Sequence, residues 1–476
     1  MIKSKPKIRT VILSSSLLTE RLLLYSSLLP ALEGEAQTAI WTTSERNLDF
    51  GDANGSAQIA IEPFPAIRPF KEFPFNYLRR LNEFAWDYKL RPPSRTGIIQ
   101  RFRDRETRLP IRALKFPARV LSLLRMENRL ESWLEGVLLG YSRSPEGARR
   151  LQATIPDVMI TTGSFRYEEP AVAAAALKLG IPTLTFITSW DNPSTKNRLV
   201  FKYDGYLAWS EQMRQDLYQF FPYTRQAPVY IVGAPQFDVF YQSRFHRSRE
   251  AFCRRQRVDP ERPIILYALG SPNLFREHDT VCYLADRVAR GELGEVQLLI
   301  RPHPLHDKGL DLASLNRWGA RVVVQDPGQA GLSVPARAQN EEQICDWVNT
   351  FRHAAVIVNL SSTAAIDAAI CDKPVVNLDY DPEPGQPRQL LVKEINHAWA
   401  HFKPIAESGG MWLVNNPAEM VEAVKTYLER PELHREQRRA MAEHVCGFLD
   451  GRCGERMAEA ILEFTRQQVQ ARGGSR

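Results

Sequence analysis

Three consecutive hydroxyl residues, Ser361, Ser362 and Thr363, stand where they could bind an anion. They follow a β-branched run at 356–358, which predicts a buried strand, and they precede a run of helix formers at 364–370. A turn between a strand and a helix offers free backbone N–H groups and the positive end of the helix dipole. We therefore expect a phosphate ligand here, although the same residues could simply cap the helix.

A second polar cluster ends another predicted strand. The apolar run 296–300 leads into Arg301 and His303, and a proline follows each of these two residues. Proline prevents helix continuation, so we expect both side chains on an extended loop at the carboxyl end of the strand, where parallel α/β sheets bind ligands. Ser271 follows a third predicted strand, 263–270. It could contact a phosphate or a ribose, or it could belong to a simple turn.

Three carboxylates follow predicted strands in the first half of the chain. Glu168 and Glu169 come after the strand 158–161, and Asp191 comes after the strand 183–187. Because successive parallel strands end at one edge of a sheet, these side chains are candidates for a general base. Each of them could instead cap a helix or form an ion pair in a loop.

We expect neither a cofactor nor a bound metal ion, because the motifs that usually indicate them are absent or incomplete. His397 and His401 are four residues apart and could face one way on a helix, but the Glu of H-E-x-x-H and a third ligand are missing. They could instead line a ligand cleft. Neither G-x-G-x-x-G nor G-x-x-x-x-G-K-S/T occurs, so dinucleotide oxidoreductases and P-loop enzymes lose their usual support.

The two phosphate-facing motifs resemble those of a known group of enzymes. Arg-Pro-His-Pro at 301–304, followed by Asn-Leu-Ser-Ser-Thr at 359–363, resembles the His-Pro and Ser-Ser/Thr motifs of GT-B glycosyltransferases and their relatives. These relatives are the bacterial sialyl- and polysialyltransferases and the CDP-glycerol glycerophosphotransferases. In them the His and the hydroxyls bind the phosphate of the nucleotide donor. The resemblance implies this role for His303, Ser361, Ser362 and, as a further candidate, Thr363.

The resemblance covers roughly residues 155–430. The segments 189–196 and 232–238 are also similar to predicted polysaccharide-biosynthesis transferases of the same fold, whereas 60–150 matches nothing that we recognise.

The order of predicted elements indicates an α/β protein of GT-B architecture. Two separate series of strand–turn–helix units predict two Rossmann-like domains facing a central cleft, and 476 residues exceed what one core usually holds. We place an N-terminal acceptor domain at 1–235 with a basic helical insertion at 60–150, a linker at 236–262, a nucleotide-donor domain at 263–430 and a helical tail at 431–476.

The insertion carries an unusual charge. Residues 79–125 contain thirteen Lys and Arg against four Asp and Glu, whereas the whole chain has a net charge of +7. Aromatic residues are interleaved with these cations. The segment is either a solvated insertion or a surface for anionic partners, such as membrane phospholipid or a lipid-phosphate acceptor. Nucleic acid is the weaker partner because no reader motif accompanies the charge.

No uncharged apolar run of 18 residues occurs. We therefore expect a cytoplasmic protein, with peripheral association at the inner membrane face as an option.

Together these motifs predict group transfer from a nucleotide-activated donor to a hydroxyl acceptor in surface polysaccharide or glycolipid biosynthesis. The donor would be a CMP-, CDP- or UDP-linked sugar, and the acceptor could be lipid-linked. His303 and the turn 361–363, supported by Arg301, would stabilise the leaving phosphate, and a carboxylate would take the acceptor proton. No D-x-D pair flanks an obvious donor site, so we expect metal-independent transfer rather than metal-dependent transfer. The resembling transferases use in-line displacement, which implies inversion at a sugar.

Three alternatives remain open at this point. The first is a CDP-glycerol-type glycerophosphotransferase. The second is a non-hydrolysing sugar-nucleotide epimerase, which would turn over a UDP-sugar without any acceptor. The third is a non-catalytic GT-B-like scaffold of a polysaccharide assembly, which would bind nucleotide without transfer.

Overall fold

The computed structural model describes residues 7–44, 59–68, 74–98, 109–141, 143–165, 168–272, 275–303, 315–326, 339–383 and 391–473. The chain forms two compact units. Unit 1 consists of Met1–Thr96, Arg103–Asp238 and Cys446–Arg476, and unit 2 consists of Gly97–Phe102 and Val239–Val445. Residues 236–262, which we expected to be a linker, are divided between the two units after Asp238.

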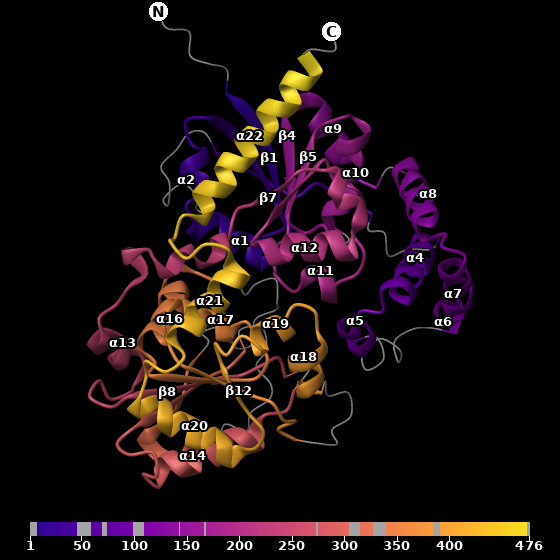
Figure 1. Ribbon diagram of the computed structural model, residues 1–476. Helices are drawn as coiled ribbons and strands as arrows, with labels where there is room; N and C mark the ends of the chain where they lie inside the picture. The colour runs from indigo at the N-terminus through magenta and orange to yellow at the C-terminus, as the bar shows by residue number, and fades with distance from the viewer. Residues whose placement is uncertain are drawn as a thin grey trace, which may run out of the picture. The chain divides into compact units, whose positions relative to one another are not determined.

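Unit 1 is built on a seven-stranded sheet in the order β3-β2-β1-β4-β5-β6-β7 (Figure 1). All neighbouring strands pair in parallel. The strands are β1 (Ile8–Ser14), β2 (Ala36–Thr42), β3 (Ile59–Pro63), β4 (Val158–Thr161), β5 (Thr183–Phe186), β6 (Gly205–Ala208) and β7 (Val229–Ile231). Every residue of β4, β5 and β6 is buried, as expected for central strands of a parallel sheet that is covered on both faces.

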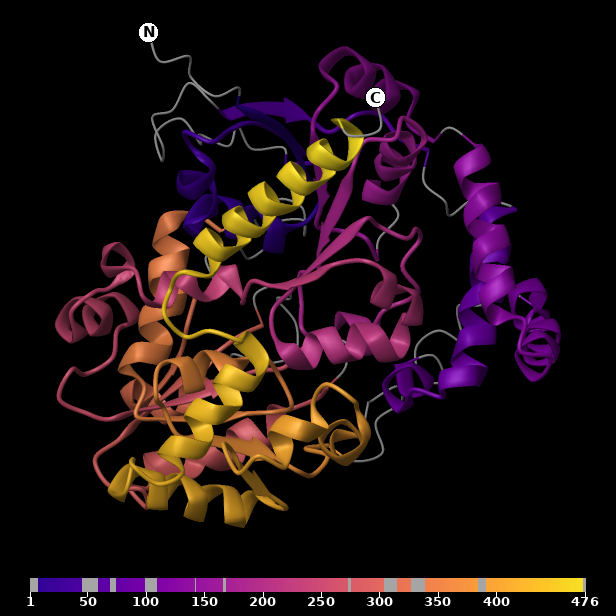
Figure 2. The same ribbon diagram turned by 45° about the horizontal axis from the view of Figure 1, so that its top comes forward.

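Helices from distant parts of the chain cover the sheet of unit 1. They are α1 (Leu17–Tyr25), α2 (Leu28–Leu32), α9 (Pro145–Thr154), α10 (Glu168–Lys178), α11 (Asn192–Thr195), α12 (Glu211–Phe220) and α22 (Cys453–Gly473). The last helix, α22, packs beside α2 and across β6 (Figures 1 and 2). Helices α1 and α2 are separated at Ser26, whose hydroxyl donates to the carbonyl oxygen of Leu22 and accepts from the N–H of Leu28.

The basic insertion is helical, as predicted, but the predicted bounds of 60–150 are too wide, because they include strand β3 of the sheet at one end and the first part of α9 at the other. It contains α4 (Phe75–Leu90), α5 (Pro93–Ile98), α6 (Leu109–Ala113), α7 (Lys115–Leu123) and α8 (Glu127–Gly140). α4 packs against both α7 and α8. Arg198 ties the insertion to the rest of unit 1, since its buried guanidinium group donates to Glu131 of α8 and to the carbonyl oxygen of Phe220. The same group lies 4.1 Å from the ring centre of Trp86 on α4.

Unit 2 contains a second parallel sheet of six strands in the order β10-β9-β8-β11-β12-β13. The strands are β8 (Ile264–Ala268), β9 (Gln297–Arg301), β10 (Val322–Val324), β11 (Val356–Asn359), β12 (Val375–Leu378) and β13 (Trp412–Val414). The helices are α13 (Arg249–Gln256), α14 (His278–Ala289), α16 (Glu341–His353), α17 (Ala364–Ile370), α18 (Val392–Ala398), α19 (Lys403–Ala406), α20 (Pro417–Glu429) and α21 (Arg435–Cys446). The two parallel α/β sheets confirm the predicted fold class.

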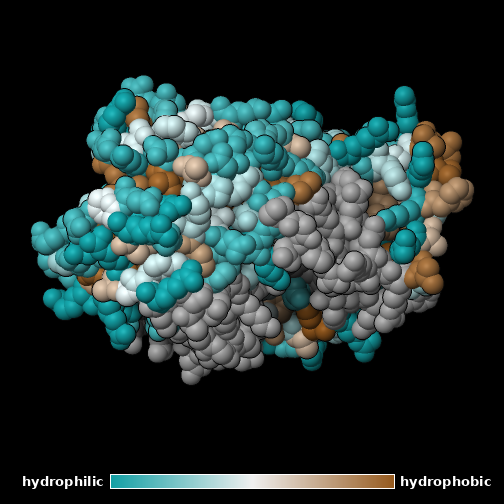
Figure 3. Space-filling model, turned by 90° about the horizontal axis from the view of Figure 1, so that it is seen from below, coloured by the Kyte–Doolittle hydropathy of each residue, from teal (hydrophilic) through white to brown (hydrophobic). Residues whose placement is uncertain are grey.

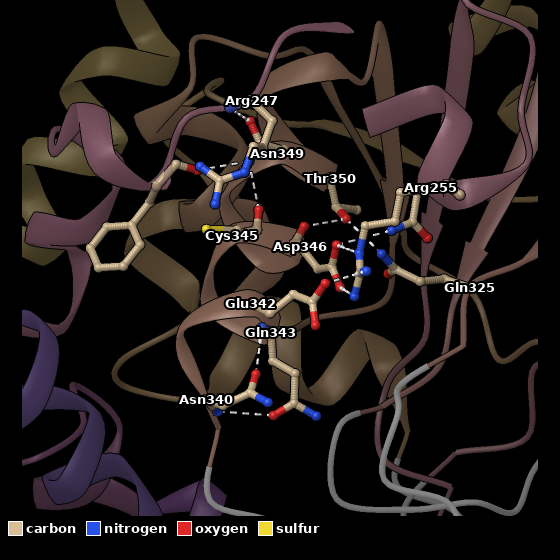
Figure 4. Close-up of polar contacts among 12 residues, drawn as sticks. Arg247, Arg255, Gln325, Asn340, Glu342, Gln343, Cys345, Asp346, Asn349 and Thr350 are labelled. Atoms are coloured by element: carbon tan, nitrogen blue, oxygen red, sulfur yellow. Dashed lines mark hydrogen bonds and ion pairs between the residues drawn. The ribbon is translucent and has the colours of Figure 1, made fainter. Parts of the chain in front are cut away.

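Helix α16 is fixed at its start and along one side, as Figure 4 shows. Asn340 and Gln343 form a reciprocal capping box at the N-terminus. On the side facing α13, Arg255 pairs with both Asp346 and Glu342. These contacts set the position of the helix that leads directly into β11.

The C-terminal tail that we expected at 431–476 forms two helices, α21 and α22, which are separated by residues 447–452. Gly447 allows this break, because its φ of +77° lies in the left-handed region. None of the helices in the described ranges combines the length and the apolar character needed to span a bilayer.

Candidate active site

Four neighbouring strands of unit 2 end at the same level. The strand register places Arg301 of β9 beside Ala268 of β8, Ala268 beside Asn359 of β11, and Asn359 beside Asn377 of β12. Neighbouring strands are about 4.8 Å apart, so the loops after β9 and β11 begin about 10 Å from each other. The strand order reverses direction between β8 and β11. Ligands of open parallel sheets bind at this kind of switch point.

The loop after β11 holds Ser361 in an unusual conformation. Its φ is +38°, which is uncommon for a residue with a side chain. The backbone N–H of Ser361 donates to Oδ1 of Asn377 at 2.8 Å, and its hydroxyl donates to Oδ1 of Asn396 at 2.7 Å. These two bonds hold a strained backbone at the end of a strand, as is common at ligand sites.

The other two hydroxyls of this loop are used differently. The hydroxyl of Ser362 accepts from the N–H of Ala364, in a turn that begins the seven-residue helix α17. Thr363 occupies the N-cap position, but its exposed side chain makes no capping hydrogen bond. The simple capping alternative therefore describes Ser362 better than it describes Ser361 or Thr363.

A polar network behind Ser361 was not predicted from the sequence. The buried side chain of Asn396, on α18, donates to Asp379 Oδ1 at 2.9 Å and to the carbonyl oxygen of Leu378. Asp379 also lies 2.9 Å from Nε2 of His397, whose side chain is half-exposed. Asn377 interrupts the apolar strand Val375–Leu378, and that polar residue is the signal from which the network could have been found.

The end of β9 is held from two sides. The carbonyl oxygen of Arg301 accepts from the N–H of Leu269 at 3.0 Å, which joins the β8 and β9 loops. On the other side, the N–H of Gln325 donates to the carbonyl oxygen of Ile300, and its side chain donates to Thr350 of α16 (Figure 4). The two predicted residues, Arg301 and His303, therefore leave the sheet from a rigid strand end.

The guanidinium group of Arg301 lies 5.5 Å from the ring centre of Phe351. Burial lowers the pKa of Arg301, while the nearby carboxylate of Asp367 acts in the opposite direction. His303 follows Pro302 and is half-buried. The sequence motif thus supplies one cation beside the ring of Phe351 and one imidazole on the adjoining loop.

The loop after β8 rests on a buried carboxyl group. The N–H of Gly270 donates to Glu277 Oε2 at 2.8 Å, and the hydroxyl of Tyr267 donates to Oε1 at 3.3 Å. Burial raises the pKa of Glu277 to about 7. A Cβ atom at Gly270 would approach a Phe275 ring carbon at 3.0 Å, so glycine lets the loop lie close to this group. Ser271, the predicted contact, comes next and is half-buried.

The carboxylate of Glu169, in unit 1, is enclosed by hydrogen-bond donors. It accepts from the backbone N–H groups of Ser15, Thr162 and Gly163 and from the hydroxyls of Ser15 and Thr162. Burial raises its pKa, and these hydrogen bonds act against that rise. Glu169 thus connects the loop after β1 to the loop after β4.

The other two candidate bases are more open. Glu168 is the first residue of α10 and is half-buried. Asp191 is also half-buried, at the start of α11, and it accepts from the hydroxyls of Ser189 and Thr195. The two carboxylate oxygens of Asp191 thus each accept a hydrogen bond from a hydroxyl group of a neighbouring residue.

Two further features concern metal binding. The expectation that no D-x-D pair flanks the donor site is wrong, because Asp379-Tyr380-Asp381 follows β12 on the same edge of the sheet as the predicted donor motifs. Asp379 is bonded to Asn396 and His397, and Asp381 accepts from the N–H of Val392. Helix α18 ends at Ala398, so buried His401 lies beyond the helix that carries His397. Within the described ranges, no group of three or more His, Cys, Asp and Glu side chains could hold a metal ion.

Comparison with known proteins decides the family. Residues 178–463, more than half of the chain, match the family model described as CDP-glycerol:poly(glycerophosphate) glycerophosphotransferase. The chain belongs to this glycerophosphotransferase family. The match includes the whole edge of unit 2 described above and also Asp191. A search of curated proteins finds no match.

Solved structures show the fold that this glycerophosphotransferase family member shares. MnaA of S. aureus, solved with UDP, has a TM-score of 0.53 at 12% identity, covering 96% of this chain and 97% of that one. UDP-GlcNAc 2-epimerase of Neisseria meningitidis, solved with UDP-GlcNAc, has a TM-score of 0.51 at 12% identity, covering 96% and 100%. TcCGT1, solved in complex with UDP, has a TM-score of 0.51 at 10% identity, covering 97% and 100%.

Such low identities establish the architecture alone. Family and fold together place the protein in the GT-B glycosyltransferase superfamily, as predicted, and make it an enzyme of group transfer from a nucleotide-activated donor.

Proposed function

We propose that unit 2 binds the nucleotide donor and that the enzyme transfers the donor's activated group to a hydroxyl acceptor in surface polysaccharide or glycolipid biosynthesis. One observation carries this proposal. The loops with Ser271, Arg301 and His303, and Ser361–Thr363 all begin at the same level of adjacent strands, at the switch point of the sheet.

The donor phosphate would lie between these loops. His303 and Arg301 supply an imidazole and a cation for the charge that develops on the leaving phosphate. Thr363 is exposed and makes no cap bond, so its hydroxyl can donate to a phosphate oxygen. Ser361 and Ser362 are already bonded to Asn396 and to the N–H of Ala364, and they would shape the loop. In this arrangement, the loops around the leaving phosphate stabilise the negative charge that develops on it during transfer.

A carboxylate of unit 1 would take the proton of the acceptor hydroxyl, and we assign this role to Asp191, with Glu168 as the second candidate. The acceptor oxygen then forms the new bond while the bond to the leaving phosphate breaks. Glu169 accepts five hydrogen bonds from the chain itself, so we assign it the ordering of the loops after β1 and β4. In-line attack predicts inversion if the transferred group is a sugar.

The donor is a CMP-, CDP- or UDP-linked compound in this proposal. Transfer of glycerol phosphate from CDP-glycerol is the second candidate, because it is the reaction named by the matching family. The products separate the two reactions. Glycerophosphoryl transfer joins the acceptor oxygen to phosphorus and releases CMP. Glycosyl transfer joins it to carbon and releases the diphosphate from a CDP- or UDP-linked sugar, or CMP from a CMP-linked sugar.

We further propose that the reaction needs no metal ion, since both carboxylates of the D-x-D pair are occupied by protein donors. Full activity after EDTA treatment is the expected result, and loss of activity that Mg²⁺ or Mn²⁺ restores would contradict it. We also propose a cytoplasmic location beside the membrane, where a lipid-linked acceptor would be within reach.

The decisive experiment begins with donor binding. A thermal-shift screen with CMP, CDP, UDP, GDP and their linked compounds should identify the donor, since bound ligand raises the Tm. His303→Ala should then lower the transfer rate by about 30- to 1000-fold, the effect of losing roughly 2 to 4 kcal/mol of transition-state stabilisation. The matched control is His444→Ala, which removes an exposed histidine from α21 and should leave the rate unchanged.

Several outcomes would change the assignment. Full turnover by the His303→Ala protein would remove this residue from the mechanism. Turnover of a UDP-sugar without any acceptor would identify an epimerase. Nucleotide binding without transfer to any acceptor would identify a non-catalytic scaffold.

A further inference from the structure

The cations and aromatic residues of the basic insertion fall into two groups. Arg79 and Arg95 are buried and pair with Glu83 and Asp87. Phe84 and Trp86 are buried as well. These four side chains therefore hold the insertion together and cannot meet a partner. Tyr88, Lys89 and Arg91 are exposed at the end of α4, but the most exposed apolar side chains that the structure describes in 79–125 lie on α6 and α7 and just after α7.

One side of α7 packs on α4. Ala118 is fully buried against Phe84 and Ala85, and Ile111 and Leu114 pack at the margin of this small cluster. α7 is thus fixed on the insertion by its inner side. Its orientation, and hence the direction of its outer side, is set by these contacts.

The outer side of α6 and α7 exposes large apolar side chains. Leu109, Phe116 and Leu123 are exposed by 79%, 77% and 75%, and Leu124 by 63%, the four highest values among the large hydrophobic residues that the structure describes. Val120 is exposed as well. Phe116, Val120, Leu123 and Leu124 have the spacing of one helix face. Figure 3 shows hydrophobic residues gathered at the right of that view, over α6 and α7.

All the charged residues of the same segment are cations. Residues 109–126 contain Arg112, Lys115, Arg119 and Arg125 and neither Asp nor Glu. Arg112, Arg119 and Arg125 are exposed. Exposed apolar side chains interleaved with cations are characteristic of helices that lie in the interface of an anionic bilayer, with the apolar groups below the headgroups and the cations beside them.

We propose that this outer side, the α6–α7 face (Leu109, Phe116, Val120, Leu123 and Leu124 with Arg112, Arg119 and Arg125), docks the protein on an anionic lipid bilayer. Charge complementarity selects this occupant, because a face with three exposed cations and no carboxylate is repelled by a second copy of itself. The proposal does not depend on the transfer reaction. Its test therefore uses lipid and no substrate.

The full chain would be sedimented with vesicles of phosphatidylcholine alone and with vesicles in which about a third of the lipid is phosphatidylglycerol. We expect binding to the anionic vesicles that weakens as salt rises from 0.05 to about 0.5 M, because screening shortens the reach of the charges. Binding to phosphatidylcholine alone should be at least about tenfold weaker, because it lacks the attraction of anionic lipid for cationic residues.

Two double variants separate the apolar and the cationic contributions. Phe116→Ser with Leu123→Ser should weaken binding by at least about tenfold, since two large apolar side chains no longer enter the bilayer. Arg112→Gln with Arg119→Gln should weaken it by about tenfold or more and reduce the salt dependence. The matched control is Leu18→Ser with Val469→Ser, which removes two exposed apolar side chains elsewhere in unit 1 and should bind as the unchanged protein does.

All variants should keep the Tm of the unchanged protein, because the replaced side chains are exposed. Unchanged vesicle binding by the Phe116→Ser, Leu123→Ser protein would overturn the proposal. Equal binding of the unchanged protein to neutral and anionic vesicles at every salt concentration would also overturn it. Self-association without lipid that this apolar double variant abolishes would reassign the face to contact between copies of the chain.

Discussion

Replacing Glu277 by Gln should change how the stability of the protein depends on pH. Glu277 is buried beneath the loop after β8, and its oxygens accept from Gly270 and Tyr267. The amide of Gln can accept from the Gly270 N–H through its oxygen and can donate to the Tyr267 hydroxyl, so the contacts persist. What changes is that the side chain at this position can no longer become charged.

The magnitude follows from the pKa of Glu277, which burial raises from 4.5 to about 7. Each unit of pKa difference corresponds to about 1.4 kcal/mol in the free energy of unfolding, so this carboxyl group accounts for roughly 3 kcal/mol of pH-dependent stability. Because the pKa is higher in the folded state, this stability is fully present below pH 4.5 and is lost as the pH rises through about 7. Only the unchanged protein has this loss, so the Gln variant should be more stable at pH 8 and equal to it near pH 4.5.

The measurement is thermal and urea unfolding of both proteins between pH 4.5 and 8.5. A difference of roughly 3 kcal/mol corresponds to about 6 to 12 °C in the Tm of a unit of 150 to 250 residues. Burial also raises the pKa of Asp216 to about 7 and that of Asp238 to about 6. Both groups are present in the two proteins, so their contributions cancel in the comparison. A difference in Tm that stays constant across this pH range would refute the reasoning.

Two further predictions concern buried polar contacts. Arg198→Ala should lower the free energy of unfolding, measured in urea, by roughly 3 to 5 kcal/mol, because it leaves Glu131 buried and unpaired. Adding Glu131→Leu should restore part of this stability. A double variant that is less stable than the single variant would contradict this account. Asn396→Ala should weaken nucleotide binding several-fold, measured by calorimetry, while the Tm falls by only a few degrees. The reason is that the Ser361 hydroxyl and Asp379 each lose a hydrogen-bond partner. Unchanged nucleotide affinity would show that this network does not support the donor site.

The elements that local sequence determines could be predicted. Short apolar runs predicted the strands that carry Arg301 and the Ser361 loop, because a strand buried on both faces is apolar along most of its length. The prolines after Arg301 and His303 predicted a loop there, because proline restricts the backbone whatever lies around it. The resemblance in these motifs led to the family that the comparison shows.

Contacts between distant parts of the chain could not be predicted in the same way. Asn396 bonds Ser361 from 35 positions away, and neither residue shows this in its own neighbourhood. The charge of 79–125 was summed along the sequence, whereas burial decides which cations can meet a partner, and burial removes Arg79 and Arg95 from that count. Glu277 lies in no motif, and its pKa depends on the desolvation that folding imposes.

The way in which the last helix completes unit 1 has a consequence for protein synthesis. The hydroxyl of Ser27 accepts from the N–H of Glu455, 428 positions later, and Asp238 accepts from Cys453 and Gly454 at the start of α22. During translation, unit 1 therefore stays incomplete until the whole of unit 2 has been synthesised. Until then, the surface that α22 covers remains exposed. A nonsense codon just before α22 would remove these contacts and leave the surface beneath the helix uncovered, although all the strands of both sheets had been made.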